Sequence, residues 1–311
     1  MFERLSRKEI LCKDTEVKRF CVDKKTIQRD IEELRMYLAD SDQGWGEIKY
    51  CKKSKGYMLA GKSETWLTNE QILATARVLL ESRAFSKHEM DELLKKLVLQ
   101  CHPVEAKRIK EIISNELHHY VAVRHGKDLM HSIWELSQAV REQRLVKLFY
   151  RRLGNKVVQR IVKPQGVIFA EYYFYLIGDI HEKDFKRPIP YRLDRIVSYE
   201  IMDEKFAFTY ANRFEEGEFR KRIQFMQPGE VIKIQLKYWG GSEEAILDRL
   251  STARVVKKEG NVWYIEAEVF DGGIKMWLLS QAEQLEVLGP PKLREDIKET
   301  IESMAKIYHH T

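Results

Sequence analysis

Several features that would place a chain in a familiar class are missing from this sequence of 311 residues. No apolar run approaches the roughly 20 residues that cross a bilayer, and the first eight residues lack the apolar core of a signal peptide. Cysteine is scarce, and no two cysteines form a C-x-x-C pair; the four are Cys12, Cys21, Cys51 and Cys101. We therefore expect free thiols in a reducing compartment, not a zinc site or a disulfide framework. These absences predict a cytoplasmic protein without a membrane partner.

The motifs that most often mark a catalytic or cofactor site are missing as well. The sequence contains no H-E-x-x-H, G-x-S-x-G, Walker or G-x-G-x-x-G pattern. The histidines of His118–His119 and His309–His310 are adjacent, so on a helix they point about 100° apart and do not present two ligands on one face. Gly240–Gly241 and Gly272–Gly273 can cradle a phosphate, but we interpret them as turns that precede helices. We expect no metal, no cofactor and no enzymatic activity.

The composition is that of a globular protein with an uneven distribution of charge. Hydrophobic residues make up 44% and charged residues 33%, and the length predicts two or three compact units. The net charge of +6 says little by itself. Between residues 141 and 163, however, eight basic residues accompany a single acid, Glu142. The eight are Arg141, Arg144, Lys147, Arg151, Arg152, Lys156, Arg160 and Lys163. This local excess predicts attraction of an anionic partner.

The first clear pattern lies at residues 22–35. Ile27, Ile31 and Leu34 fall on one face of a helix, and Asp23 is a suitable N-cap. A second short helix is predicted at 16–21, with Val17 and Phe20 on one side, which gives the skeleton of a helix-turn-helix. Residues 47–51 and 57–59 predict a β-hairpin with a basic tip.

The exposed positions of this region are suited to DNA. Gln and Arg side chains can read adenine and guanine edges, and lysines at a hairpin tip can hold the phosphate backbone. The candidate DNA-binding residues are Lys24, Lys25, Thr26, Gln28, Arg29, Lys52, Lys53 and Lys55. For Lys24 and Lys25 alone, an ordinary solvated helix is the alternative.

Helices dominate the next segment, from residue 68 to about 120. Thr68-x-x-Gln71 and Ser86-x-x-Glu89 match capping boxes, and Pro103 suits the first turn of a third helix. The buried stripe of the first of these helices is predicted at Ile72, Ala76, Leu79 and Leu80. We expect a helical connector with a role in dimerisation, and a fourth helix at about 129–143.

After residue 145 the pattern changes to short strands separated by turns. Strands are predicted at 146–150, 159–168, 172–179, 190–193 and 196–201, which suggests a small barrel or sandwich. From residue 231 the elements follow the order βαββαβ of a ferredoxin-like unit, and a last helix is expected at about 293–308. The predicted fold class is thus a multidomain α+β protein.

Two motifs carry resemblances to known families. Val22-Asp23-x-x-Thr26-Ile27-x-Arg29-Asp30-Ile31-x-x-Leu34 resembles the recognition helix of DeoR-like winged-helix repressors, and residues 55–59 resemble the end of their wing. Residues 1–14 are short for a complete first helix and turn.

Residues 173–177 and 191–196, together with Tyr150, Arg160 and Pro164, carry the second resemblance. They are similar to the WYL domain, an Sm-like β-barrel found behind winged helices in bacterial regulators. Phe174 stands at the position of the family's tryptophan, so the indole N–H donor is absent. The resemblance implies a pocket for a nucleic-acid-related or other anionic effector, and the last part of the chain resembles the extension that often follows this barrel. The candidate effector-binding residues are Tyr150, Arg160, Phe174, Tyr175, Arg192 and Arg195.

The residues themselves allow more than one arrangement of this site. In an extended strand Tyr173 and Tyr175 share one face, so either these two or Phe174 face the core. Arg160, Arg192 and Arg195 can bind phosphate, and Tyr150 or Tyr175 can stack on a base. The alternatives are that the aromatic rings are core residues and that Arg195 pairs with Asp194 or another acid.

These observations lead to one hypothesis for the whole chain and one rival. We expect a homodimeric DNA-binding transcriptional regulator whose WYL barrel senses a nucleotide or single-stranded nucleic acid and modulates binding to a double-stranded DNA operator. The predicted domains are a winged helix-turn-helix at 1–61, a helical connector at 62–128, the barrel at 129–205 and the ferredoxin-like extension at 206–311. The rival is a nucleic-acid-processing accessory protein or a small-molecule enzyme that acts through the barrel.

Overall fold

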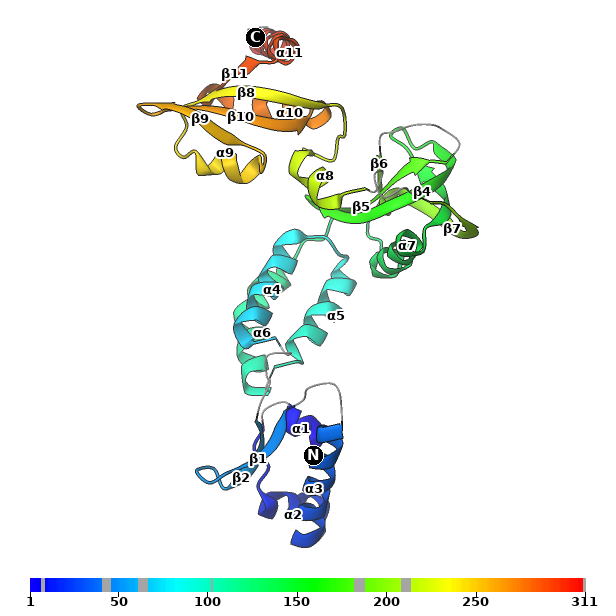
Figure 1. The fold of residues 1–311 in the computed structure, drawn as a ribbon, viewed down its shortest axis with the longest axis vertical. Helices are drawn as coiled ribbons and strands as arrows, with labels where there is room; N and C mark the ends of the chain where they lie inside the picture. The colour runs from blue at the N-terminus through cyan, green and yellow to red at the C-terminus, as the bar shows by residue number, and fades with distance from the viewer. Residues whose placement is uncertain are drawn as a thin grey trace. The chain divides into compact units, whose positions relative to one another are not determined.

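The computed structural model describes residues 1–6, 9–40, 46–60, 67–101, 103–181, 188–207 and 214–309. The chain folds into two compact units, Met1–Asp128 and Leu129–Thr311 (Figure 1). All four cysteines are free thiols, as predicted. Within the described ranges, no helix has both the length and the apolar character needed to cross a membrane.

The first unit begins with three helices and a hairpin. The helices are α1 (Phe2–Ser6), α2 (Lys13–Phe20) and α3 (Lys24–Asp40). Asp23 caps α3, because its carboxylate accepts the backbone N–H of Thr26 at 2.7 Å. Ile27 and Ile31 are fully buried in the core below α3, which confirms the predicted stripe. The helix extends five residues beyond the predicted end at residue 35.

Helix α2 differs from its prediction. Val17 packs against the core, but Phe20 is 48% exposed, and the most buried residue of the helix is Glu16. A carboxylate can be buried here because the Arg4 guanidinium of α1 lies 2.6 Å from its Oε1 atom. The short segment before residue 14 thus forms a helix of five residues that is tied to α2 by an ion pair.

The predicted hairpin is present as β1 (Glu47–Cys51) and β2 (Gly56–Ala60), which pair antiparallel. Leu11 forms an isolated bridge with Tyr57 of β2, and two backbone hydrogen bonds of 2.8 Å connect the two residues. This bridge ties the segment between α1 and α2 to the hairpin. A Cβ atom at Gly56 would lie 2.5 Å from a methyl carbon of Ile10 and 3.0 Å from the carbonyl oxygen of Leu11, so glycine lets this segment approach the hairpin closely.

Helices α4 (Asn69–Ser82), α5 (Lys87–Val98) and α6 (Pro103–His118) complete the first unit. The capping box of Thr68 and Gln71 is formed in both directions, and Ser86 accepts the backbone N–H of Glu89 at 3.1 Å. The third helix begins at Pro103, as predicted. Ile72, Ala76 and Leu80 are buried, whereas Leu79 of the predicted stripe is only half-buried.

The second unit begins with helix α7 (Met130–Glu142), followed by a five-stranded antiparallel sheet in the order β6-β5-β4-β3-β7. The strands are β3 (Arg144–Arg151), β4 (Val157–Ala170), β5 (Tyr173–Ile180), β6 (Ile189–Arg192) and β7 (Ile196–Lys205). All five were predicted: β3, β4 and β7 are longer than expected, and β5 and β6 are shifted by one residue. Leu136 and Ala139 of α7 pack on the buried side chains of this sheet.

This sheet must curl, because its two edge strands are consecutive in the chain. Only the turn Leu193–Arg195 joins β6 to β7. Such a link reaches at most about 14 Å between the strand ends, whereas the edges of a flat five-stranded sheet lie about 19 Å apart. The hydroxyl of Tyr150 on β3 also accepts the backbone N–H of Arg192 at 3.3 Å, so the end of β6 lies beside β3.

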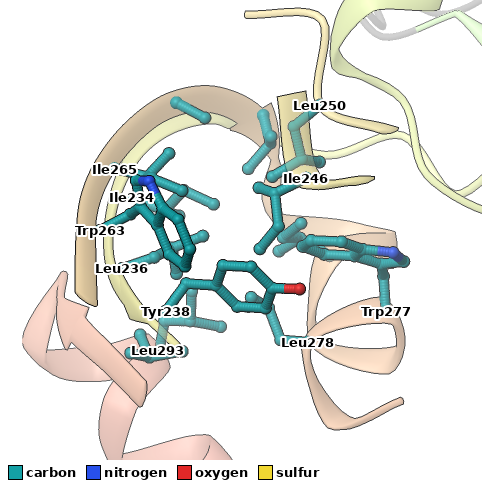
Figure 2. Packing of buried hydrophobic residues seen from close by; sticks show 14 residues of the cluster. Ile234, Leu236, Tyr238, Ile246, Leu250, Trp263, Ile265, Trp277, Leu278 and Leu293 are labelled. Carbon is teal, nitrogen blue, oxygen red and sulfur yellow. The ribbon is translucent and has the colours of Figure 1, made fainter. Parts of the chain in front are cut away.

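Helix α8 (Glu216–Arg222), which was not predicted, leads to a second sheet. The following elements are β8 (Val231–Tyr238), α9 (Glu244–Arg249), β9 (Arg254–Glu259), β10 (Val262–Phe270), α10 (Asp271–Leu279), β11 (Leu285–Gly289) and α11 (Pro291–His309). They follow the predicted order, and the strands form an antiparallel sheet in the order β11-β8-β10-β9. Figure 2 shows Ile246 of α9 and Trp277 of α10 facing Tyr238 and Trp263 of the sheet.

Candidate functional site

The exposed surface of the first unit carries the predicted DNA-binding cations on α3. Lys24 is paired with Asp14 at 2.5 Å, and Arg29 lies 3.6 Å from Glu33. All four side chains are well exposed. Lys25 has no ion pair among the described residues. Thr26 belongs to the cap of the helix, because hydrogen bonds from its backbone and side chain lower the pKa of Asp23. Exposed ion pairs are weak, so Lys25 and Arg29 remain available to an anionic partner.

The sequence predicted that the Gln28 side chain projects freely from α3, but in the structure it is engaged. Its Oε1 atom accepts the hydroxyl of Tyr57 at 3.0 Å, and its Nε2 atom donates to Glu32 at 2.7 Å. The ring of Tyr57 lies 5.5 Å from the guanidinium of Arg35, which also donates to the carbonyl of Ile48 on β1. Gln28 therefore connects α3 to the hairpin, and its amide is already occupied.

The tip of the hairpin contains the other three predicted lysines. Lys52, Lys53 and Lys55 are exposed in the turn between β1 and β2, and none has an ion pair within the described part of the chain. Tyr50, which the sequence did not single out, is 51% exposed beside this turn and packs edge-on against Tyr57. Unpaired cations thus lie both on α3 and at the hairpin tip.

The second unit has a cavity of about 330 Å³ at the end of β3. Tyr150 and Arg195 line it, and they are two of the six predicted effector-binding residues. Its other walls are Arg152, Leu153 and Lys156 of the turn between β3 and β4. The side chains of Arg152, Lys156 and Arg195 have no ion pair with any described residue, and no acidic residue lines the cavity. We name it the Tyr150 cavity.

Arg192 lies outside the Tyr150 cavity, although it is only three residues from Arg195. Its guanidinium makes two hydrogen bonds to Asp194, of 3.0 and 2.8 Å, and stacks 3.4 Å from the centre of the Tyr173 ring. The carboxylate of Asp194 is 7% exposed. The sequence left open a pair between Arg195 and Asp194, but the partner of Asp194 is Arg192.

The other three predicted effector residues do not line the Tyr150 cavity. Tyr175 is a core residue, and burial raises its pKa to about 12. Phe174 packs against Phe169 at 5.1 Å, on the opposite face of the strand. Arg160 is half-buried and donates to the carbonyl of Gln159. Arg160 is close enough to Tyr191 for its charge to act on that phenol, although burial dominates and raises the pKa of Tyr191 to about 12.

The geometry of the Tyr150 cavity suits a phosphorylated or otherwise anionic ligand. Three cations without carboxylate partners can neutralise phosphate oxygens, and the phenol ring of Tyr150 offers a stacking surface. That ring is fixed by Tyr191, which lies edge-on at 5.2 Å, and by the backbone of Arg192. Arg152 and Lys156 were missed as site residues, although both belong to the basic excess between residues 141 and 163.

The glycine pair of α10 and the histidine pair at the end of α6 are in packing contacts. Gly272 and Gly273 lie inside the first turn of α10, not before it, and Cβ atoms there would clash with the carbonyls of Pro228 and Gln224. The rings of His118 and His119 are in edge-on contact at 4.9 Å, and His310 lies outside the described residues. Within the described ranges, no group of three or more potential ligands is placed to hold a metal ion.

Comparison with protein families identifies two domains in the second unit. The WYL domain matches residues 132–201, and the WCX domain matches residues 241–305. These matches confirm the resemblance that was predicted from residues 150–196 and from the C-terminal extension. A search of curated proteins gave no match.

Two solved structures are similar to most of the chain at low identity. One is proteasome accessory factor B/C (PafBC) of Arthrobacter aurescens, with 17% identity, a TM-score of 0.33, and coverage of 97% of this chain and 46% of that one. The other is a CRISPR Cas-related protein, with 16% identity, a TM-score of 0.37, and coverage of 90% and 76%. This chain therefore spans about half the length of PafBC.

Proposed function

We propose that this protein, which contains a WYL and a WCX domain, is a DNA-binding transcriptional regulator. Its first unit binds a double-stranded operator through α3 and the hairpin tip. Its WYL domain binds an anionic effector, a nucleotide or short single-stranded nucleic acid, and thereby modulates operator binding. The proposal includes a homodimer, since two copies of α3 can read two half-sites, and it assigns no enzymatic activity.

The proposal interprets each part of the fold. We take α2, α3 and the hairpin β1–β2 as a winged helix-turn-helix, because a helix with an exposed basic N-terminal half is followed by a basic hairpin. The curled sheet β3–β7 is interpreted as an Sm-like barrel. The antiparallel sheet with α9 and α10 on one face is interpreted as a ferredoxin-like unit.

The Tyr150 cavity is the observation that carries the effector part of the proposal. It brings Arg152, Lys156 and Arg195 together beside an aromatic ring, and all three cations lack an acidic partner among the described residues. A regulator needs a ligand site separate from its DNA-binding surface, and this cavity lies in the other unit of the chain. A cluster of acids with perturbed pKa values, or a metal, beside Arg192 and Arg195 would favour the rival, an enzyme acting through the barrel. Asp194, the acid between the two arginines, is engaged by Arg192.

Titration calorimetry with nucleotides and short oligonucleotides tests this assignment. A variant with Lys156→Glu and Arg195→Glu should bind the effector at least tenfold more weakly, because two attractive charges become repulsive. Arg141→Glu is the matched control, since Arg141 is 74% exposed and belongs to the same basic excess but lies outside the cavity. Equal heats from the wild type and the double variant would place the effector elsewhere.

A further inference from the structure

Two of the four free thiols, Cys12 and Cys51, belong to one row of residues across the hairpin. Cys12 directly precedes α2, and Cys51 is the last residue of β1. The bridge between Leu11 and Tyr57 places Cys12 beside Gly56 of β2, and Gly56 pairs with Cys51 on its other side. Both cysteines are half-buried, so they are accessible to a small ion.

The side chains of Cys12 and Cys51 share one face of the hairpin. Residues that pair directly across antiparallel strands point to the same face, so the Cys51 side chain lies on the side where a Cβ atom of Gly56 would lie. The Sγ atom of Cys12 lies 3.1 Å from that Cβ position. Because Gly56 has no side chain, β2 places no side chain of its own between the two thiols.

Ser54, in the turn of the hairpin, lies next to both cysteines. The Cys12 thiol donates to the Ser54 carbonyl, with a distance of 3.7 Å between Sγ and the oxygen. The side chain of Ser54, and then its backbone, lower the pKa of the Cys51 thiol against the opposing effect of burial. Cys51 therefore loses its proton more easily than an ordinary cysteine, and the thiolate is the form that binds a metal ion.

The spacing of the two cysteines suits a bridging metal ion better than a disulfide. Cys12 and Cys51 lie on opposite sides of β2, so their Cα atoms are about two strand spacings apart, roughly 9–10 Å. A disulfide requires Cα atoms within about 7 Å of each other. A metal ion between two sulfur atoms adds two bonds of about 2.3 Å each, so it spans a wider gap.

We propose that Cys12 and Cys51 bind one soft monovalent metal ion, of the class of Cu(I), between their two sulfur atoms. Thiolates select Cu(I), and such a closed-shell ion is stable with two ligands in a line. Zn²⁺ is disfavoured because structural zinc sites have four ligands, and within the described part of the chain no third potential ligand joins these two.

The charge around the site favours this complex. Each thiol releases a proton as its bond to the ion forms, so two thiolates and one monovalent ion leave one negative charge. Lys52, Lys53 and Lys55 follow Cys51 directly in the turn, and none of them has an ion pair among the described residues. These cations stabilise the negative complex, and their contribution adds to that of Ser54.

Competition with a chromogenic Cu(I) chelator, on the reduced full chain without oxygen, tests this proposal. The wild type should withhold one equivalent of Cu(I) per chain. Cys12→Ser and Cys51→Ser should each weaken binding at least tenfold, because a single thiolate remains. Cys21→Ser is the matched control, since it removes an exposed thiol outside the row. Equal Cu(I) affinity of the wild type and both site variants would overturn the proposal.

Hydrogen exchange of the wild type locates the ion without relying on any variant. Cu(I) should slow exchange of the amides of residues 10–12 and of the hairpin, because the ion cross-links these two segments. The amides of α4, α5 and α6 should not change. Unchanged exchange at the hairpin, or an equal change in all these elements, would contradict the site. No DNA is present in these measurements, so their failure would leave the proposed regulator function untouched.

Discussion

Single residues of one motif have different roles in this protein. Arg192 and Arg195 are three positions apart, yet Arg192 is held by Asp194 and by the Tyr173 ring, while Arg195 faces the Tyr150 cavity without an acidic partner among the described residues. A guanidinium that already makes two hydrogen bonds to a carboxylate has little capacity left for phosphate. We therefore expect Arg195, and not Arg192, to contact the proposed effector.

Gln28 and Arg29 should have separable effects on DNA binding. Arg29→Ala should relax the base preference at one position and cost about 1–3 kcal/mol with the preferred duplex. Gln28→Ala and Tyr57→Phe should instead weaken all duplexes to a similar, smaller extent, since both break the hydrogen bond between α3 and the hairpin. Competition among duplexes with single base changes measures this difference. If Gln28→Ala alone abolished the discrimination among these duplexes, Gln28 would be the residue that contacts the bases.

Asp179 should make stability depend on pH. Burial raises its pKa, against the hydrogen bond from Gln165 and the charge of Lys163, and its Oδ1 atom has no hydrogen bond among the described residues. The unfolded chain therefore ionises first, and stability falls as the pH rises from about 4 through the raised pKa. Asp179→Asn should be more stable than the wild type at pH 7 and show little difference at pH 3.5. Denaturant unfolding at both pH values tests this, and an equal difference at both would refute it.

At the scale of elements, the first unit depends on an ion pair between its first two helices. Arg4 of α1 contacts both Glu9 and the buried Glu16 of α2, and the hydrogen bond to Glu9 contributes most to the raised pKa of Arg4. Without Arg4, the Glu16 carboxylate would remain buried with no cation beside it. The five-residue helix α1 thus stabilises α2, on which α3 rests.

Arg4→Ala should lower the free energy of unfolding of the first unit by about 2–3 kcal/mol. Removing one partner of a fully buried ion pair costs about 3–5 kcal/mol. We expect a smaller loss here because the Arg4 side chain is 23% exposed. Hydrogen exchange of the α2 and α3 amides should accelerate accordingly. Arg19→Ala, which removes an exposed cation from α2, is the control and should have little effect. Equal exchange in both variants would show that Glu16 does not need Arg4.

The sequence was sufficient for most elements but not for their contacts. The periodic stripe of α3 and the alternating strands are local patterns, so they were predicted correctly. Helix α8 was missed because only Phe219 of its seven residues is buried, which leaves no stripe to detect. The contacts of Glu16 and Gln28 were not predicted, because their partners, Arg4 and Tyr57, are 12 and 29 positions away in the chain. No local pattern contains such pairs.

The same limit applies to the candidate sites. The basic excess between residues 141 and 163 correctly indicated a positive region, and Tyr150 and Arg195 were named. The sequence could not indicate that the turn between β3 and β4 places Arg152 and Lys156 beside them, nor which arginine pairs with Asp194. Those outcomes depend on how the sheet curls.

In the proposed function, DNA binding and effector binding belong to different compact units of the chain. Lys25, Arg29 and the hairpin lysines belong to the first unit, and the Tyr150 cavity belongs to the second. In a regulator, such sites are coupled through a change in the equilibrium between conformations, and each ligand then alters the affinity for the other by the same factor. The proposal therefore depends first on whether the first unit recognises a defined DNA sequence.

Recovery and sequencing of DNA crosslinked to the protein in cells tests this point most directly. The comparison is between the wild type and a Lys25→Ala, Arg29→Ala double variant expressed at the same level. Fragments bound by the wild type should share one sequence motif, and the double variant should lose that enrichment because two exposed cations of α3 are gone. Wild-type fragments without a common motif, or a motif equally enriched with the double variant, would contradict a sequence-specific regulator that reads DNA through α3.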